Sequence, residues 1–192
     1  MLLNKNTSKR KIWGLYEYVL NAWLSQKIQS HSNFIDIGAN NGYHTYGFSY
    51  AASRAGHRDV RVISVEPDVG EQLLAPRNWN EYRSLSIDII EKYCRAEPGE
   101  GITIHDLISN MESGLIKMDI EGGEREVIPS NIDILSNRKF DWCIEIHGKD
   151  LIVEIAAAFC SAKRPFLIKD MPQLPFIGGE PRPILTTWLV TI

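Results

Sequence analysis

The chain has 192 residues, of which 44% are hydrophobic and 23% are charged, and this composition excludes an intrinsically disordered protein. The length is typical of a single domain, and the formal net charge of −3 gives no indication of nucleic-acid binding. No apolar run approaches the length of about 18 residues that a transmembrane helix needs. The N-terminus lacks the apolar stretch of a signal peptide. The cysteines, Cys94, Cys143 and Cys160, have no metal-site spacing and are typical of a reducing compartment. We therefore expect a cytoplasmic protein without a membrane span or a nucleic-acid partner.

The chain begins with a short basic tail and a predicted helix. Apolar residues recur at steps of three and four between residues 12 and 28, which predicts an amphipathic helix. We expect this helix to pack across the sheet of the main core, although a substrate cover or a dimer face is also compatible with Tyr16 and Trp23. Residues 1–30 thus precede a core at 31–192, within one domain.

A strand, a glycine loop and a helix follow, and the rest of the chain is organised around them. Residues 34–37 are apolar enough for a short strand, Gly38 and Gly42 lie in the loop, and 44–55 is the expected helix, ended by Gly56. Backbone N–H groups at such a junction point at a nucleotide, and glycine lets a ligand approach the backbone closely. The loop lacks the glycines of a dinucleotide fingerprint and the lysine of a P-loop. A tight turn without a ligand is the structural alternative.

Strands and helices alternate along the remaining sequence. Buried parallel strands are apolar and β-branched without turn signals, and proline interrupts helices. By these signals we predict strands at 60–66, 85–90, 115–120, 140–146, 166–168 and 185–192, and helical segments at 71–79, 124–135 and 151–162. Such alternation is typical of an α/β protein with a Rossmann-like, doubly wound, mostly parallel sheet that has helices on both faces.

Polar residues follow four of the predicted strands, directly where each strand ends. They lie at 36–41, 66–68, 119–124 and 145–147. Ligands of such sheets bind at the carboxyl ends of the strands, so the four clusters are expected to form one site. Glu66, one βα unit after the glycine loop, is placed to accept hydrogen bonds from both hydroxyls of a ribose. A cap for the next helix is the alternative for this side chain.

Three short motifs occur in order between residues 33 and 147. The first is Asp-Ile-Gly-Ala-Asn-x-Gly at 36–42, the second is Lys-x-Asp-x-Glu-Gly-x-Glu at 117–124, and the third is Glu-x-His at 145–147. Residues 104–107, Ile-His-Asp-Leu, are similar to a Thr-Leu-Asp-Asp-Leu segment with two departures. With these motifs the chain resembles the FkbM family of class I methyltransferases, which use S-adenosylmethionine (SAM). A dehydrogenase would not be expected to contain the second and third motifs.

The resemblance implies a SAM-dependent methyltransferase, most simply one that acts on a hydroxyl of a small molecule or glycan. The residues that would line the methionine and ribose side of SAM are Asp36, Gly38, Asn40 and Gly42. Glu66 would hold the ribose, and Asp119 would lie near the sulfonium and the acceptor. Acidic residues are favourable there because SAM carries a sulfonium and an ammonium group.

The acidic motifs also contain the candidates for catalysis. A hydroxyl acceptor must lose a proton, and His147 is the natural base because histidine titrates near neutrality; Asp119 and Glu145 are the other candidates. Together with Glu121, these three side chains are compatible with a Mg²⁺ site, which would lower the pKa of the acceptor hydroxyl. The structural alternatives are a helix cap for Glu121 and Glu124 and a backbone hydrogen bond for His147.

Parts of the chain depart from the family pattern. The segment 80–102 is short compared with the family and offers no clear adenine contact except Asp88. The segment 172–183 is rich in proline and glycine and is either a substrate lid or a plain surface loop. A SAM-fold binding protein without catalysis, or a methyltransferase acting on nitrogen or on a macromolecule, is therefore an alternative. A nicotinamide oxidoreductase is disfavoured by the glycine loop.

Overall fold

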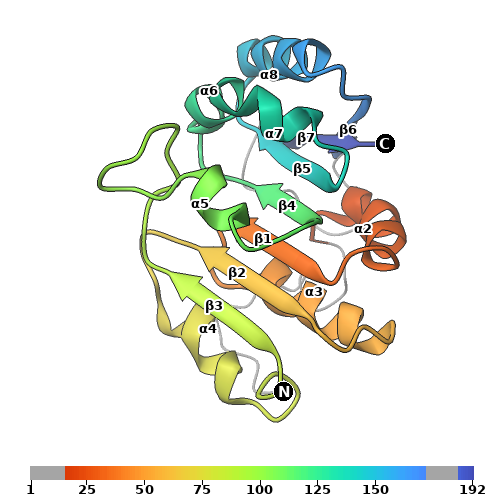
Figure 1. The fold of residues 1–192 in the computed structure, drawn as a ribbon, viewed down its shortest axis with the longest axis vertical. Helices are drawn as coiled ribbons and strands as arrows, with labels where there is room; N and C mark the ends of the chain where they lie inside the picture. Colours follow the sequence, from red (N-terminus) through yellow and green to blue (C-terminus); the bar gives the residue numbers. More distant parts are fainter. Residues whose placement is uncertain (1–15, 172–185) are drawn as a thin grey trace, which may run out of the picture.

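The computed structural model describes residues 16–171 and 186–192. These residues form one seven-stranded sheet with the strand order β3-β2-β1-β4-β5-β7-β6 (Figure 1). The strands are β1 (Asn33–Ile37), β2 (Arg61–Val65), β3 (Ser86–Ile90), β4 (Gly114–Met118), β5 (Phe140–Ile146), β6 (Phe166–Met171) and β7 (Thr186–Thr191). Neighbours from β3 to β5 are parallel, whereas β7 runs antiparallel to both β5 and β6. The predicted mostly parallel sheet is therefore confirmed.

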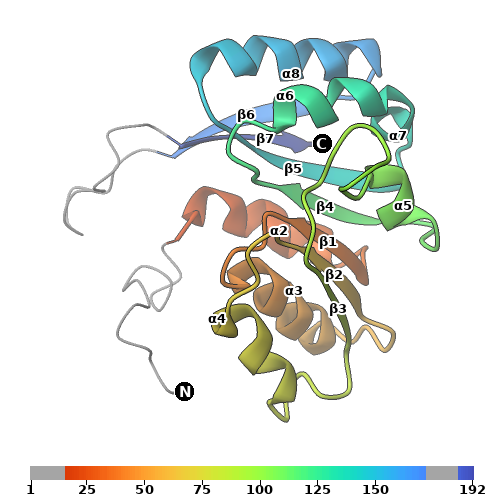
Figure 2. The same cartoon turned by 90° about the vertical axis from the view of Figure 1, so that its left-hand side faces the viewer.

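Helices cover both faces of the sheet (Figures 1 and 2). One face packs against α2 (Asn21–Ile28), α3 (Tyr43–Arg54) and α4 (Glu71–Leu74), and the other against α5 (Ile104–Ile108), α6 (Glu124–Val127), α7 (Ile132–Ser136) and α8 (Lys149–Ser161). Short 3₁₀ turns are η1 (Tyr18–Leu20), η2 (Ala75–Asn78) and η3 (Pro129–Asn131). Because successive side chains of a strand point to opposite faces, β1 places Phe34 in one core and Ile35 in the other.

The helix boundaries follow the proline and glycine signals. The predicted helices 44–55 and 151–162 are present as α3 and α8. Gly56 ends α3 with a φ of 96°, and its N–H bonds back to a carbonyl of the helix. The two predicted helices that contain proline are broken, with Pro76 in η2 and Pro129 in η3.

The predicted N-terminal helix is interrupted at Glu17. Among the described residues, helical structure begins with η1 at Tyr18, because Glu17 has a left-handed φ of 48° that a helix does not accommodate. The rest of the prediction holds for α2, where Trp23 Nε1 donates a hydrogen bond of 2.7 Å to the carbonyl of Thr191 in β7. Residues 1–15, including the basic tail, and the predicted loop at 172–183 lie outside the described residues. No helix among the described residues is long and apolar enough to cross a membrane.

The strand order reverses between β1 and β4, at the centre of the sheet. The chain runs from β1 outward to β2 and β3, and from β4 outward to β5 on the other side. Ligands of open α/β sheets bind at such a point, outside the carboxyl ends of the strands. The arrowheads of β2 to β5 point to the left-hand side of Figure 1. All four predicted polar clusters follow strands that end at this edge.

Candidate active site

Two glycines shape the loop between β1 and α3. Gly38 has a φ of 74°, and a Cβ there would lie only 1.7 Å from the carbonyl oxygen of Asp119. Gly42 has a φ of 78°, and its Cβ would lie 2.8 Å from the ring of Tyr46. Asn40, between them, also adopts a left-handed φ of 49°. The loop therefore passes too close to β4 and α3 for side chains at the two glycines, and this accounts for the glycine motif.

Glu66 connects this loop to the end of β2. Its carboxylate accepts the backbone N–H of Asn40 at 2.7 Å and that of Asp68 at 3.1 Å. The structure thus brings the predicted ribose acid next to the glycine loop. The alternative role as a cap for the next helix is not supported, because that helix, α4, begins only at Glu71.

Asp36 lies beneath the loop and is not open to solvent, with 0% of its surface exposed. Its carboxylate accepts a hydrogen bond from the Thr45 hydroxyl at 2.7 Å and pairs with Lys117 Nζ at 3.2 Å. Lys117 also donates to the carbonyl of Gly38 at 2.9 Å. Asp36 therefore supports the glycine loop indirectly, through Thr45 and Lys117. Burial alone would lower the pKa of Lys117, but Asp36 and Asp119 raise it above its ordinary value, so this lysine is charged.

The second and third motifs meet at His147. Its Nε2 lies 3.4 Å from Asp119 Oδ1, 3.8 Å from Glu121 Oε2 and 3.9 Å from Glu145 Oε1. Its Nδ1 lies 3.2 Å from Glu124 Oε1. His147 therefore bonds a carboxylate and not the backbone carbonyl expected from the structural alternative.

Glu121 and Glu124 have different roles although both belong to the same motif. Glu124 is fully buried, and its two oxygens accept the backbone N–H groups of Ile120 and Gly122 at 2.9 and 2.8 Å. These N–H groups belong to the turn before α6, which begins at Glu124 itself, so Glu124 holds this turn and is not the helix cap that the alternative expected. Glu121 is 74% exposed and lies at the rim of the cluster.

The pKa values of His147 and Glu145 in this cluster are both raised. The hydrogen bond to Glu124 raises the pKa of His147 to about 9, against the opposing effect of burial and with help from Glu145 and Asp119. Burial, followed by the negative charges of Asp119 and Glu17, raises the pKa of Glu145 to about 8. At neutral pH the imidazole is thus protonated and Glu145 is largely neutral, so His147 is not yet a base.

The donor set of a metal site is present among these residues. Asp119, Glu145 and His147 each offer a ligand atom, and these atoms lie within 4.8 Å of one another. Carboxylates with one imidazole are compatible with Mg²⁺ or Mn²⁺. A metal would have to displace the proton of His147, because only the neutral imidazole is a ligand. The predicted metal site therefore fits the geometry and remains a prediction.

Sequence reasoning missed Glu17, His44 and Tyr43, which border the site, and named Tyr16 only for a possible substrate cover or dimer face. Glu17 is buried and contacts the imidazole of His44, and Tyr16 packs its ring against Tyr43. The charge of Glu17 also acts on Lys117 and on Glu145. The signal available in the sequence was that Glu17 is the single acid within residues 12–28, next to apolar positions of the predicted helix.

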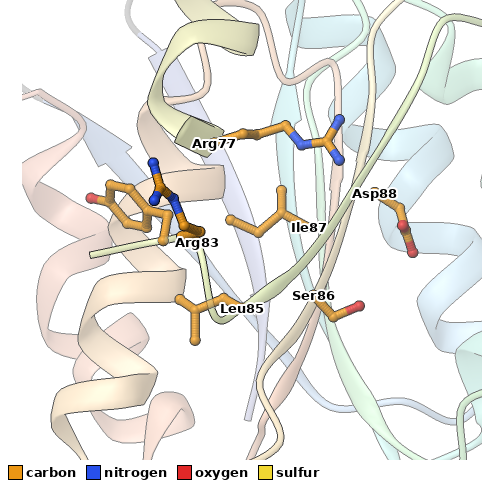
Figure 3. A pocket seen from close by; sticks show the side chains of 7 residues that line it. Arg77, Arg83, Leu85, Ser86, Ile87 and Asp88 are labelled. Atoms are coloured by element: carbon orange, nitrogen blue, oxygen red, sulfur yellow. The ribbon is translucent and has the colours of Figure 1, made fainter. Parts of the chain in front are cut away.

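A cavity of about 230 Å³ lies beside the edge strand β3, away from the polar clusters (Figure 3). Its lining residues are Arg77, Tyr82, Arg83, Leu85, Ser86, Ile87 and Asp88. Asp88 lies in the middle of β3, opposite Ile63, and its carboxylate is 3.9 Å from Arg61. This position does not favour the suggestion that Asp88 contacts adenine, because the side chain is not at the carboxyl end of its strand.

Comparison with known proteins defines the fold. No protein-family model matches the chain, and no curated protein matches it. Among solved structures, a methyltransferase FkbM from Methylobacillus flagellatus KT superimposes with a TM-score of 0.60 and 18% identity, over 83% of this chain and 43% of that one. A precorrin-6y C5,15-methyltransferase from Geobacter metallireducens GS-15 has a TM-score of 0.57 and 12% identity, over 100% of this chain and 91% of that one. The chain has the class I methyltransferase fold.

A third structure extends the comparison. A SAM-dependent O-methyltransferase from Thermotoga maritima has a TM-score of 0.51 and 12% identity, over 88% of this chain and 63% of that one. At these identities the likeness establishes the fold and not the substrate. This chain spans less than half the length of the FkbM methyltransferase structure.

Proposed function

We propose that this protein is a SAM-dependent methyltransferase that transfers a methyl group to a hydroxyl of a small molecule or glycan, as its motifs shared with the FkbM family imply. The observation that carries the proposal is the position of its polar residues. The glycine loop with Glu66 lies on one side of the switch point of a class I methyltransferase fold, and the cluster of Asp119, Glu145 and His147 lies on the other.

The residues present are compatible with the ribose of SAM and with its positively charged sulfonium. Each oxygen of Glu66 accepts one backbone N–H, which leaves further lone pairs for two ribose hydroxyls. Apart from Glu145, which is largely neutral, the acids around the centre are Glu17, Asp36, Asp119 and Glu124, and the bases are His44, Lys117 and His147. This excess of acids favours a cation. When bound, SAM supplies an electrophilic methyl group on a sulfonium.

His147 would accept the proton of the acceptor hydroxyl. Its Nδ1 is held by Glu124, so Nε2, on the side of Asp119 and Glu145, is the nitrogen that serves the acceptor. A cationic ligand near Asp119 would oppose the positive charge of the imidazolium and lower the pKa of His147, so that the imidazole could act as the base. Asp119 and Glu145 orient the acceptor.

Mg²⁺ held by Asp119, Glu145 and His147, with Glu121 at the rim, is the second way to activate the acceptor. The metal and the imidazolium exclude each other, because both need the same nitrogen. Activity that requires Mg²⁺ and is abolished by EDTA would support the metal, and activity unchanged by EDTA would support His147 as the base.

The test is methyl transfer from labelled SAM to a panel of hydroxylated metabolites and oligosaccharides, measured with Mg²⁺ and with EDTA. We expect label in at least one acceptor, attached to oxygen. The His147→Ala variant should lower turnover by about 100-fold or more, as loss of a general base does, while its affinity for S-adenosylhomocysteine changes little. Turnover that is unchanged in this variant would remove His147 from the mechanism, and label on nitrogen or on a macromolecule would replace the proposed acceptor.

A further inference from the structure

The strand β3 forms one edge of the sheet in the described part of the chain. It pairs with β2 on one side, and no described strand pairs with its other side. The N–H of Ser86 donates to the carbonyl of Val60, on the side of β2, at 3.3 Å. Because successive residues of a strand direct their backbone groups to alternate sides, Ile87 and Ile89 direct theirs away from β2. This outer edge therefore presents backbone donors and acceptors to which another strand can bind.

The cavity of about 230 Å³ reaches around this edge. Successive side chains of a strand point to opposite faces, so Ser86 and Asp88 belong to one face of β3 and Leu85 and Ile87 to the other. All four line the cavity, and Figure 3 shows them on the two sides of the strand. A cavity lined from both faces lies next to the free backbone between them. A strand added to β3 could therefore place a side chain in it.

Two guanidinium groups give the cavity its charge. Arg77 in η2 and Arg83 in the turn before β3 are exposed, and both line the cavity. Among the described residues neither side chain forms an ion pair, and Arg83 donates one hydrogen bond of 3.3 Å to the carbonyl of Asn78. The one acid of the lining, Asp88, lies 3.9 Å from Arg61 Nε. The cavity therefore has an excess of positive charge, which complements a carboxylate.

Aromatic side chains border the charged cavity. Tyr82 lines it, and its ring centroid lies 6.2 Å from that of Trp79, which is 46% exposed. The buried Tyr46 of α3 packs edge-to-face against Tyr82 with centroids 4.9 Å apart, and this contact fixes the Tyr82 ring. Tryptophan, tyrosine and arginine are the residues that most often contribute the binding energy of protein interfaces. The surface therefore favours a protein partner over a small anion.

We infer that β3 is a docking edge for an extended, acidic segment of a partner protein. The segment would add to the sheet as a strand, bind the backbone of Ile87 and Ile89, and place a carboxylate beside Arg77 and Arg83. The inference is independent of the proposed function, because the cavity lies away from the polar clusters.

The charge of the edge distinguishes this partner from other strands. Antiparallel pairing of β3 with a second copy would bring the arginines of both copies together, and like charges opposite each other are destabilising. Residues 1–15 contain no acid, so they lack the side chain that the cavity complements. Residues 172–185 connect β6 and β7, which lie at the opposite end of the strand order.

The test uses a displayed library of short random peptides, selected on the full wild-type chain. We expect the enriched peptides to share one acidic position flanked by β-branched residues, which are typical of strands. Fluorescence anisotropy then compares the most enriched peptide with its analogue that carries a neutral amide in place of the acid. The neutral peptide should bind about tenfold more weakly, since a hydrogen bond to a charged group is lost.

Variants of the two arginines show whether the acid enters the cavity. Arg77→Gln and Arg83→Gln should each weaken binding of the acidic peptide by up to about tenfold and change binding of the neutral peptide little. Arg138→Gln is the matched control, because Arg138 is an exposed arginine before β5, distant from β3 in the strand order. Equal weakening in the control would reduce the effect to general attraction of charge and would overturn the inference.

Hydrogen exchange tests the strand pairing itself. The backbone amides of Ile87 and Ile89 should exchange more slowly in the complex than in the free protein, whereas the amide of Ser86, already bonded to Val60, should change little. Binding without this protection would overturn the inference. So would a library that yields no binder or no shared acid, or an acidic peptide that binds both arginine variants as tightly as the wild type. Protection of the same amides in a dimer of the chain alone, detected by sedimentation, would assign the edge to a second copy instead.

Discussion

Lys117 connects the two halves of the site at the scale of single residues. Its ammonium group lies 3.2 Å from Asp36 and 3.7 Å from Asp119, and it donates to the carbonyl of Gly38. A buried charge pair adds little net stability when complete, but removing one partner leaves the other charge buried without compensation. The burial of Lys117 therefore makes it necessary to the fold as well as to the geometry of the glycine loop.

Replacing Lys117 by methionine tests this role. We expect the Lys117→Met variant to lose about 3 to 5 kcal/mol of the free energy of unfolding, because Asp36 remains buried without its cation. Urea denaturation followed by circular dichroism measures the loss. Lys139→Met, at an exposed lysine, is the control and should change stability by less than about 0.5 kcal/mol. Equal stability of the two variants would refute the importance of the buried pair.

The protons of His147 and Glu145 predict how stability depends on pH. Their folded-state pKa values, about 9 and about 8, lie above the ordinary values of 6.5 and 4.5. The native protein therefore binds more protons than the unfolded chain, and its free energy of unfolding falls as pH rises. The contribution of His147 is complete below pH 6.5 and is lost by about pH 9.

Denaturant titrations at several pH values between about 6 and 9 measure this dependence. We expect the free energy of unfolding of the wild type to decrease across that range and that of His147→Gln to decrease less. Since Glu145 retains its own raised pKa, some dependence should remain in the variant. A wild-type profile that is flat, or that rises with pH, would contradict the protonation states assigned to the cluster.

Single residues also show what a sequence motif can and cannot predict. Glu66 lies where its motif predicts, because its position at a strand end fixes its direction. Asp36 belongs to an equally clear motif, yet it is buried, because it lies within strand β1 and not in the loop that follows the strand. Glu17 contacts His44, which is distant in the sequence, and its neighbour Tyr16, and neither residue belongs to a motif.

A buried charge cluster around Asp141 attaches the helix α2 to the sheet, although Asp141 is far from α2 in the sequence. The carboxylate of Asp141 in β5 lies 3.0 Å from Lys27 Nζ, 2.9 Å from His31 Nε2 and 2.8 Å from Arg164 Nη2. It also accepts the hydroxyl of Thr191 in β7. Although burial opposes ionisation, these partners hold the pKa of Asp141 well below its usual range.

Asp141→Asn should therefore destabilise the protein strongly. We expect a loss of about 3 to 5 kcal/mol, because Lys27 and Arg164 would share a neutral amide. A lowered pKa stabilises the fold above the ordinary value of 3.8, so this contribution to wild-type stability is lost as pH falls below it. Thermal unfolding at neutral and acidic pH checks both statements. A variant as stable as the wild type at neutral pH would show that the cluster does not hold α2.

The predicted elements differ in how far local sequence determines them. The central strands are predicted within a residue or two, because buried parallel strands are apolar along their whole length. The predicted N-terminal helix is interrupted at Glu17, because apolar periodicity does not reveal the left-handed backbone of this residue. Asp141 gave no signal either, since it lies within an apolar strand and its partners come from three other parts of the chain.

At the scale of the whole molecule, the site depends on the order of the strands. Placing β4 next to β1 brings Asp119 against Gly38, and Glu17 contacts His44 in α3. The alternation of strands and helices predicted the parallel sheet and the edge at which the polar clusters meet. It did not predict the antiparallel insertion of β7 between β5 and β6, because pairing between distant segments is not encoded in local periodicity.

The most direct test of the account is a calorimetric comparison of SAM and NAD binding by the wild type and Glu66→Ala. We predict that the wild type binds SAM and not NAD, and that Glu66→Ala binds SAM at least about tenfold more weakly, since each hydroxyl loses a charge-assisted hydrogen bond. The variant should unfold at nearly the same temperature as the wild type, because Glu66 is only partly buried. Binding of NAD in place of SAM, or no binding of SAM at all, would contradict the proposed cofactor and with it the proposed reaction.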